Sequence, residues 1–405
     1  MQNFNIMTVL PITIALFFWL SLFAILYTYF GYPILIWLMP SLNKKIAPIP
    51  YTPSVTLLIA AYNERNVIEE KIKNSLAIDY PKDKLQIIVV TDGSDDGTEQ
   101  VVKPFEKFGI TLLHQPQRNG KMAAINRAMP YTTGEIIVFS DANNFYKPDT
   151  IQKLVQPFAD SQVGAVSGSK TIEKGDGELG NSEGLYWKYE SFIKKQESRV
   201  SSCTSVAGEI LAIRKSIYST PPNYIINDDF YSAMQTLRQG YKLIYVEDAK
   251  STERISPSAK DEIVRRRRIN AGRYQAISLS FKLLPKNPIL IWQIVSHKYL
   301  RPLVPFFMII VFTMNLAAVF IPYPKPNHWF YLSPPVDLIF LILQITFYLM
   351  AIVGMKIERQ QGDSRLRLLF YLPTFLVNSN LAALQGFFQF IKGGQGHLWQ
   401  KVERR

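Results

Sequence analysis

The sequence predicts an α/β, Rossmann-like domain with a mostly parallel sheet, flanked by transmembrane helices. Two observations lead to this fold class. Between residues 50 and 285, short apolar runs alternate with amphipathic stretches, which is the pattern of parallel strands connected by covering helices. Before and after this region lie uncharged apolar runs, and a membrane-spanning helix needs about 20 such residues.

The composition narrows the functional classes. The chain has 405 residues, of which 48% are hydrophobic and 13% aromatic, and this excludes a disordered chain. Its one cysteine, Cys203, excludes a disulfide framework and a cysteine-based zinc site. Lys and Arg number 45 against 32 Asp and Glu, a net charge of +13. We attribute this excess to basic residues beside anionic lipid rather than to nucleic-acid binding, because no nucleic-acid module is recognisable.

The first apolar stretch, residues 1–43, predicts an N-terminal transmembrane anchor. No charged residue precedes Lys44, and Met7–Leu38 is almost wholly apolar. A cleaved signal peptide would have a basic start and a shorter apolar core, so we expect this anchor to be retained. The Gly-Tyr-Pro run at 31–33 predicts a bend. Lys44 and Lys45 follow at once, which places the next region in the cytoplasm by the positive-inside rule.

The C-terminal region, residues 286–405, predicts an interfacial helix followed by spans at about 302–323 and 335–355. A third segment, 368–391, is uncharged but is interrupted by Pro373, Asn378, Asn380 and Gln385. If it crosses the bilayer, the basic tail lies outside, against the positive-inside rule. If it is re-entrant, the tail stays cytoplasmic. The sequence supports both alternatives equally.

Within the cytoplasmic domain, residues 50–285, the apolar runs predict strands at Val55–Ala60, Gln86–Val90, Ile110–Leu113 and Glu135–Phe139. The stretches between them predict helices at Val67–Ala77, Thr98–Lys107 and Met122–Met129. Sheets of this kind bind ligands beyond the carboxyl ends of their strands. The polar residues that directly follow each strand are therefore the candidate site.

Acidic residues follow three of these strands. Asn63 and Glu64 follow the first strand, the run DGSDDGT begins at Asp92 after the second, and SDANN begins at Ser140 after the fourth. Neither a G-x-G-x-x-G fingerprint nor a Walker motif is present, which disfavours a dinucleotide dehydrogenase or a P-loop enzyme. Three acidic strand ends instead indicate a site for a sugar nucleotide and a divalent cation. We expect Asp95 and Asp96 to cap the helix that follows.

Taken in order, the motifs AAYNE, DGSDDGT, GKMAAIN, SDANN and NDD resemble the inverting family-two glycosyltransferases with the GT-A fold, over about residues 50–275. The layout of one N-terminal span and several C-terminal ones resembles the membrane-integrated branch, which includes synthases of poly-N-acetylglucosamine, cellulose and hyaluronan. The closing run GGQGHLWQKVERR is similar to the tail of bacterial exopolysaccharide glycosyltransferases. Any one motif alone would be a weak signal, but five in order are a strong one.

The resemblance implies a set of nucleotide-sugar-binding residues: Asn63, Glu64, Asp92, Lys121, Asp141 and Arg268. Asp92 would bind the base or the ribose, although Asp-Gly-Ser is also a good turn sequence. Lys121 opens a helix, where its ammonium group and the free N–H groups suit a phosphate. A solvated lysine is the alternative.

Asp141 and Asn143 occupy the place of the family's D-x-D metal motif. The resemblance implies that they bind Mg²⁺ or Mn²⁺, which would neutralise the diphosphate leaving group through oxygen ligands. Asn143 departs from the family's second aspartate and offers a neutral oxygen ligand. An Asx-turn before the helix near Pro148 is the alternative.

Asp228 and Asp229 precede an amphipathic helix, where an aspartate is a natural N-cap. The resemblance implies another role for Asp229, that of the general base on the acceptor hydroxyl, beside Asp228. Inversion from an α-linked donor would give a β-linked product.

The acceptor side is implied to include Gly208, Glu209 and Ile269. Processive relatives have Q-x-x-R-W where this chain has RRRRI, residues 265–269. Arg268 matches the family arginine and would clamp the diphosphate through two hydrogen bonds. Ile269 replaces the tryptophan on which the acceptor sugar stacks, which weakens the expectation of processive extrusion. Attraction of the four arginines to the membrane surface is the other explanation of this run.

The sequence as a whole predicts a multi-pass plasma-membrane enzyme with a cytoplasmic catalytic domain. It would transfer a sugar from a UDP-linked donor to a growing polysaccharide with inversion, in cell-surface or exopolysaccharide synthesis. One alternative is single-sugar transfer to a membrane lipid. Another is a non-catalytic subunit of a polysaccharide export complex, which the retained Asp92, Asp141 and Asp229 argue against. With so few spans, a homo-oligomer or a partner export subunit would have to complete a channel.

Overall fold

The computed structural model describes residues 6–43, 50–172, 177–253, 259–321, 327–357 and 366–393. The chain divides into two compact units, Met1–Leu35 with Ser296–Phe388, and Ile36–Val295 with Gln389–Arg405. The predictions that concern Lys44, Lys45 and the tail after residue 393 lie outside the described residues.

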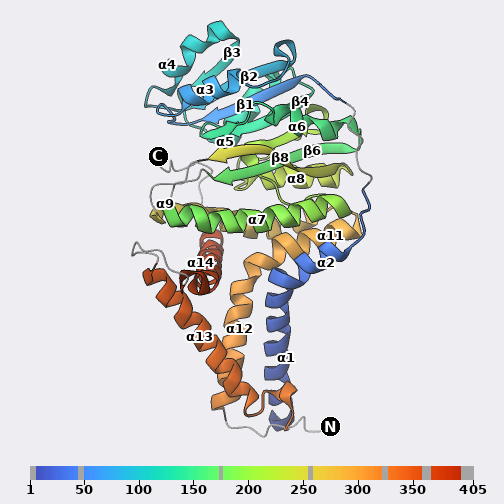
Figure 1. The fold of residues 1–405 in the computed structure, drawn as a ribbon, viewed down its shortest axis with the longest axis vertical. Helices are drawn as coiled ribbons and strands as arrows, with labels where there is room; N and C mark the ends of the chain where they lie inside the picture. The colour runs from blue at the N-terminus through green and yellow to red at the C-terminus, as the bar shows by residue number, and fades with distance from the viewer. Residues whose placement is uncertain are drawn as a thin grey trace. The chain divides into compact units, whose positions relative to one another are not determined.

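The second unit is built on an eight-stranded sheet with the strand order β3-β2-β1-β4-β7-β6-β8-β5 (Figure 1). Its strands are β1 (Val55–Ala61), β2 (Leu85–Asp92), β3 (Ile110–Gln115), β4 (Ile136–Asp141), β5 (Asn144–Tyr146), β6 (Val163–Ile172), β7 (Leu211–Arg214) and β8 (Lys242–Glu253). The first four run parallel to one another. Strand β7 is antiparallel to β4 and β6, β8 is parallel to β6, and β5 is antiparallel to β8. The predicted α/β class and the parallel arrangement of the four predicted strands are confirmed.

Helices accompany this sheet in the same unit (Figure 1). They are α3 (Ile68–Leu76), α4 (Thr98–Val102), α5 (Lys121–Ala128), α6 (Thr150–Val155), α7 (Gly177–Val200), α8 (Asp228–Arg238), α9 (Ala259–Ser278), α10 (Ser280–Leu283) and α11 (Pro288–Ile294). Strand β1 is buried along nearly its whole length, as expected for a strand with covered faces.

The predicted helix Thr98–Lys107 is shorter than expected. Helix α4 ends at Val102, and the chain continues as a 3₁₀ helix over Lys103–Phe108. Pro104 explains the change, because proline has no N–H group to extend an α-helical ladder.

The register of the sheet places the candidate residues together. Ala61 of β1 pairs with Thr91 of β2, and Ala60 pairs with Asp141 of β4. The carboxyl ends of these three strands therefore finish at one edge of the sheet. The strand order reverses at β1 and β4, and ligands bind at such a switch point in open α/β sheets.

The first unit contains α1 (Ile6–Leu26), α12 (Leu300–Phe320), α13 (Val336–Ile357) and α14 (Leu366–Ile391). A π-helical turn, Tyr27–Gly31, follows α1 and leads into α2 (Tyr32–Leu38), so the predicted bend falls at a change of helix type. Within the described residues, three helical segments are long and apolar enough to cross a membrane: Val9–Leu38, Pro288–Phe320 and Val336–Lys356. Helix α14, predicted to be spanning or re-entrant, is not among them.

Apolar packing and a few polar contacts join the helices of the first unit. Ile14 and Phe18 of α1 pack with Val311 and Ala318 of α12 in one buried cluster. The indole N–H of Trp19 donates to the carbonyl oxygen of Phe330 at 2.8 Å.

Candidate active site

A pocket opens at the carboxyl ends of β1, β2 and β4, with an empty volume of about 530 Å³ that includes the space at its mouth. Its lining residues are Ala60, Ala61, Tyr62, Glu64, Asp92, Arg118, Gly120, Lys121, Ala124, Asp141, Ala142 and Asn143. The structure therefore brings together Glu64, Asp92, Lys121, Asp141 and Asn143, as the sequence predicted.

The two carboxylate oxygens of Asp92, at the end of β2, differ in their hydrogen bonds. Its Oδ2 accepts hydrogen bonds from the backbone N–H groups of Asn119 at 3.0 Å and Gly120 at 2.6 Å. Gly120 is the N-cap of α5, so one of the amides expected to be free for a phosphate holds this carboxylate instead. Among the described residues, the buried Oδ1 has no hydrogen-bond partner. A buried polar atom without a partner is rare, and a ligand hydroxyl or N–H group would satisfy it.

Lys121, at the start of α5, forms an ion pair with Asp141 at the end of β4. Its Nζ lies 2.6 Å from Oδ1 of Asp141, and both side chains are largely buried. Burial disfavours the ammonium form, but attraction to Asp141, Asp228 and Asp229 outweighs it and raises the pKa of Lys121. Lys121 is therefore charged, and its ammonium group attracts the carboxylate of Asp229, the candidate base.

Asp229 lies in the first turn of α8 and has the properties of a base. Its Oδ1 accepts a hydrogen bond from the backbone N–H of Phe230 at 2.7 Å. Burial, and next the charge of Asp228, raise the pKa of Asp229 to about 6. A catalytic base works best when its pKa is near the working pH.

The residue before α8 does not cap the helix through a side chain. Asn227 occupies the N-cap position, but its Nδ2 donates to the carbonyl oxygen of Ile269 at 3.0 Å. The alternative in which an aspartate caps this helix is therefore wrong, because Asp228 and Asp229 both lie inside its first turn.

Gly208 packs directly against the candidate base. A Cβ atom at this position would lie 2.9 Å from Cβ of Asp229 and 3.3 Å from its Oδ2. Gly208, one of the predicted acceptor-side residues, is thus placed beside the site by its contact with Asp229. Its acceptor role itself stays a prediction.

Helix α9 contributes Arg268 to the site. Burial lowers the pKa of Arg268, and its attraction to Asp228, Asp141 and Asp229 opposes this effect. Arg268 thus interacts electrostatically with the carboxylates around the pocket, while its predicted contact with the diphosphate stays a prediction. Ile269 is half-buried, and its backbone, through Asn227, holds α9 against the loop that leads into α8.

Asn63 belongs to a loop contact outside the pocket lining. It adopts a left-handed backbone conformation with φ of 54°. Its Nδ2 donates to Asp95 Oδ1 at 2.6 Å, and the N–H of Asp95 donates back to Asn63 Oδ1 at 2.9 Å. The N-cap of α4 is Gly97, without a side-chain cap, so the predicted cap by Asp96 does not form. Asp96 lies one residue earlier, where its Oδ1 accepts from the N–H of Thr98 at 3.0 Å. The predicted cap by Asp95 does not form, because that side chain binds Asn63.

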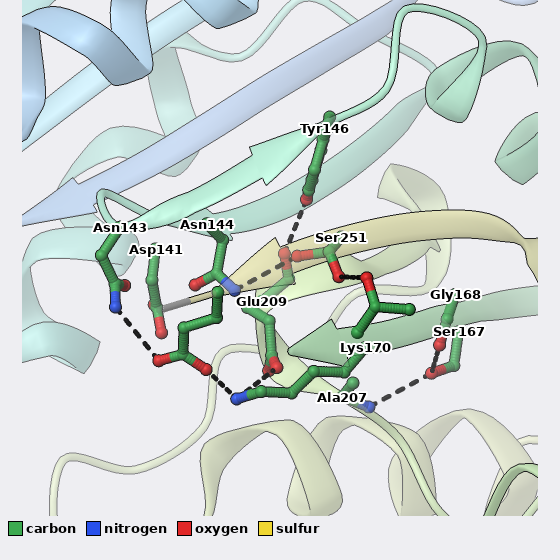
Figure 2. A network of polar contacts seen from close by, with 12 residues as sticks. Asp141, Asn143, Asn144, Tyr146, Ser167, Gly168, Lys170, Ala207, Glu209 and Ser251 are labelled. Carbon is green, nitrogen blue, oxygen red and sulfur yellow. Dashed lines mark hydrogen bonds and ion pairs between the residues drawn. The ribbon is translucent and has the colours of Figure 1, made fainter. Parts of the chain in front are cut away.

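Glu209 belongs to a buried polar network rather than to the pocket lining. Its Oε1 lies 3.1 Å from Nζ of Lys170, which also forms an ion pair with Glu253. Figure 2 shows Asn143, Lys170 and Glu209 gathered beside Asp141. Lys170 and Glu253 were not predicted, because they lie on β6 and β8, far from any recognised motif.

Arg118 is a further residue that the sequence analysis missed. Its guanidinium carbon lies 3.9 Å from the ring centroid of Tyr62, and it lines the pocket. Among the described residues, its buried Nη2 has no hydrogen-bond partner. The signal was present, because Arg118 follows strand β3 just before Lys121.

The donor set suits a divalent cation that is also held by phosphates. No group of three or more His, Cys, Asp or Glu side chains that could hold a metal occurs in the described part of the chain. Asp141 offers a carboxylate and Asn143 an amide, and both line the pocket. Mg²⁺ is commonly bound in this way, through one or two carboxylates together with substrate phosphates and water.

The residues that line this pocket lie within a region of the chain that matches a known family. Residues 56–220 match the family model "Glycosyl transferase family 2". Poly-beta-1,6-N-acetyl-D-glucosamine synthase of Staphylococcus aureus is 25% identical over 252 residues, which cover 60% of this chain and 59% of the synthase. The match thus spans less than two thirds of that relative. Beta-monoglucosyldiacylglycerol synthase of a Nostoc species is 32% identical over 124 residues, 30% of this chain and 26% of that enzyme.

A solved structure shares the fold. The mannosyltransferase PcManGT from Pyrobaculum calidifontis, solved in complex with GDP-Man and Mn²⁺, superposes with a TM-score of 0.69 at 23% identity, covering 95% of this chain and 100% of that one. The family match identifies residues 56–220 as part of a glycosyltransferase domain of family 2, and the superposition shows that this domain has the GT-A fold. Helices long and apolar enough to cross a membrane flank the domain.

Proposed function

We propose that this protein is a membrane-bound inverting glycosyltransferase that transfers a sugar from a UDP-linked donor to a growing polysaccharide with formation of a β-glycosidic bond. The observation that carries the proposal is the electrostatic link between a base and a donor pocket. Asp229, with its pKa raised to about 6, interacts with Lys121, which lines the pocket.

Each residue has a chemical role in this reaction. Asp92 binds the nucleoside through its unpartnered Oδ1, and Arg118 and Lys121 hold the diphosphate. Asp229 removes the proton of the acceptor hydroxyl as its oxygen attacks the anomeric carbon from the face opposite the leaving group. Arg268 supplies positive charge as the glycosyl–phosphate bond breaks.

A divalent cation, Mg²⁺ or Mn²⁺, would be held by Asp141 and Asn143. When bound, it neutralises charge on the departing diphosphate. The presence of Mn²⁺ and GDP-Man in the PcManGT complex supports both the cation and a nucleotide-sugar donor.

The proposal has two versions, which differ in the molecule that accepts the sugar. Similarity to the poly-N-acetylglucosamine synthase favours a polysaccharide acceptor in cell-surface synthesis. Transfer of a single sugar to a membrane lipid is the second candidate, favoured by Ile269 in place of an aromatic platform and by similarity to the beta-monoglucosyldiacylglycerol synthase. We place the catalytic domain on the cytoplasmic side of the plasma membrane, where sugar nucleotides are made.

The test is donor turnover by the purified full-length protein, with a panel of UDP- and GDP-sugars and Mg²⁺ or Mn²⁺. Asp229→Asn should lower turnover at least about 100-fold, the usual contribution of a general base. Asp83→Asn serves as the matched control and should leave turnover unchanged, because Asp83 is exposed and does not line the pocket.

Product analysis then distinguishes the acceptors. Long polymer supports the synthase, and a single sugar on lipid supports the alternative acceptor. A folded protein that turns over no donor would contradict the proposal and favour the non-catalytic subunit.

A further inference from the structure

Asn143 stands where family members have the second aspartate of the metal motif, and its side-chain amide is held in one orientation. The residue is 7% exposed. Its Nδ2 donates to Oε1 of Glu253 at 3.1 Å. An ionised carboxylate can only accept hydrogen bonds, so the NH₂ end of the amide must face Glu253. The carbonyl oxygen is left as the end that can meet a ligand.

Glu253 is itself held by Lys170. The ammonium group of Lys170 contacts Oε2 of Glu253, the oxygen that does not face Asn143, and lies 3.1 Å from Oε1 of Glu209. Lys170 is 9% exposed. Burial disfavours its charged form, but Glu209 and Glu253 outweigh this and raise its pKa. Lys170 is therefore an ammonium group, with three donors and no acceptor.

These contacts form a chain with one possible polarity. Lys170 donates to Glu253, and Asn143 donates to the other oxygen of the same carboxylate. Figure 2 shows Asn143 at the Asp141 end of this network and Lys170 in its interior. We propose that Glu253 is a positioning residue that turns the carbonyl oxygen of Asn143 toward the cation, so that a neutral amide serves where the family has a carboxylate. This inference rests on the cation site of the proposed function.

Because each hydrogen bond in this chain has a fixed donor and acceptor, replacing Glu253 by glutamine tests the proposal. In Glu253→Gln, an NH₂ group turned toward the ammonium of Lys170 would place two donors against each other. The introduced glutamine therefore turns its oxygen toward Lys170 and its NH₂ toward Asn143. Asn143 then has to flip, which presents NH₂ to the cation. In the double variant Asn143→Asp/Glu253→Gln, the introduced aspartate accepts from the glutamine and still offers an oxygen to the cation. The double variant should therefore rescue the single one.

The experiment measures Mn²⁺ binding to the full-length protein by the electron paramagnetic resonance signal of free Mn²⁺, with UDP present at saturation. Glu253→Gln should weaken binding about 10- to 100-fold, as is typical when a partner of a metal ligand is removed. The double variant should return to within a few-fold of the wild-type protein. Glu247→Gln is the matched control, because Glu247 is on the same strand and forms an exposed ion pair with Lys195 at 2.8 Å. It should bind Mn²⁺ as the wild type does.

Thermal melting of each variant verifies that it is folded. The inference is overturned if Glu253→Gln binds Mn²⁺ as tightly as the wild type, or if the double variant remains as weak as the single one. Those results would leave sugar transfer and its cation in place. Wild-type protein that takes up no more Mn²⁺ than Asp141→Asn would instead remove the cation from the proposed function, and this inference with it.

Discussion

Asp229 is a carboxyl group whose protonation state should decide when transfer occurs. Because burial and Asp228 raise its pKa to about 6, the group is protonated and unable to accept a proton below that pH. We expect the turnover rate to rise with pH through about 6. Asp228→Asn removes one cause of the raised pKa and should move this rise to lower pH. The measurement is turnover at saturating donor from pH 4.5 to 8. A rise that stays in place, or that moves to higher pH, would contradict the assignment.

Gly208 is the residue whose lack of a side chain allows Asp229 its position. In Gly208→Ala, the added Cβ would lie 2.9 Å from Cβ of Asp229, so the base must shift. Small displacements of a catalytic group can lower rates about 100-fold. We expect turnover to fall by one to two orders of magnitude while UDP affinity, measured by calorimetry, stays near wild type. An equal loss of both would point to a general disruption of the fold.

The sequence alone identifies those site residues that belong to a continuous motif. Asp92, Asp141 and Lys121 follow strand ends or open a helix, so their convergence could be inferred from the parallel sheet. Lys170 and Glu253 could not, because their pairing depends on β6 and β8 lying side by side. That register is a property of the folded sheet and leaves no local pattern in the sequence.

At the scale of elements, helix α3 braces the short strand β5, which follows the candidate metal motif. Nζ of Lys71 donates to the carbonyl oxygen of Asn144. The side chain of Asn74 bonds both backbone groups of Tyr146, at 2.9 Å to its N–H and 2.8 Å to its carbonyl oxygen. The loop that presents Asp141 and Asn143 is thus fixed from behind by a helix.

This brace makes stability depend on pH. Burial lowers the pKa of Lys71 from 10.5 to about 7, with Asp141 opposing the shift. Between these values the unfolded chain binds the proton and the folded chain does not, so stability should rise with pH through this window. In Lys71→Met this contribution is absent. We expect the thermal midpoint of the wild type, relative to that of Lys71→Met, to increase between pH 7 and 9. A constant difference would show that Lys71 keeps an ordinary pKa.

The predicted elements differ in how well the sequence determined them. Strands β1, β2 and β4 are continuous apolar runs, and their bounds agree with the prediction within two residues. Strand β8 carries polar residues between its apolar ones and was not predicted. The helix after Asp92 is shorter than the apolar pattern predicts, because Pro104 ends the α-helical hydrogen bonding.

At the scale of the whole molecule, the number of spanning helices decides on which side each end lies. Three described segments are long and apolar enough to cross a membrane. If these three segments cross, with the catalytic domain after the first, the end of α14 lies on the side of that domain when α14 does not cross and on the opposite side when it does. The two alternatives for α14 therefore differ in the side on which residue 393 lies.

Cysteine labelling tests this topology. The native Cys203 is buried, so the background should be low. Asn327→Cys, between α12 and α13, should react with a membrane-impermeant maleimide in intact cells. Gly393→Cys, just after α14, should react only after the membrane is permeabilised. Labelling of Gly393→Cys in intact cells would show that α14 crosses the bilayer.

The ion pair between Lys121 and Asp141, 2.6 Å apart, has a consequence for the order of events during turnover. A cation that approaches Asp141 alone must compete with the lysine, and a diphosphate that approaches Lys121 alone must compete with the aspartate. If both bound, one ion pair would be exchanged for two, with the cation on Asp141 and the diphosphate on Lys121. Each should therefore strengthen binding of the other by the same factor. The Lys121–Asp141 pair would then break when the cation and the nucleotide bind together, and it would form again once the spent nucleotide leaves.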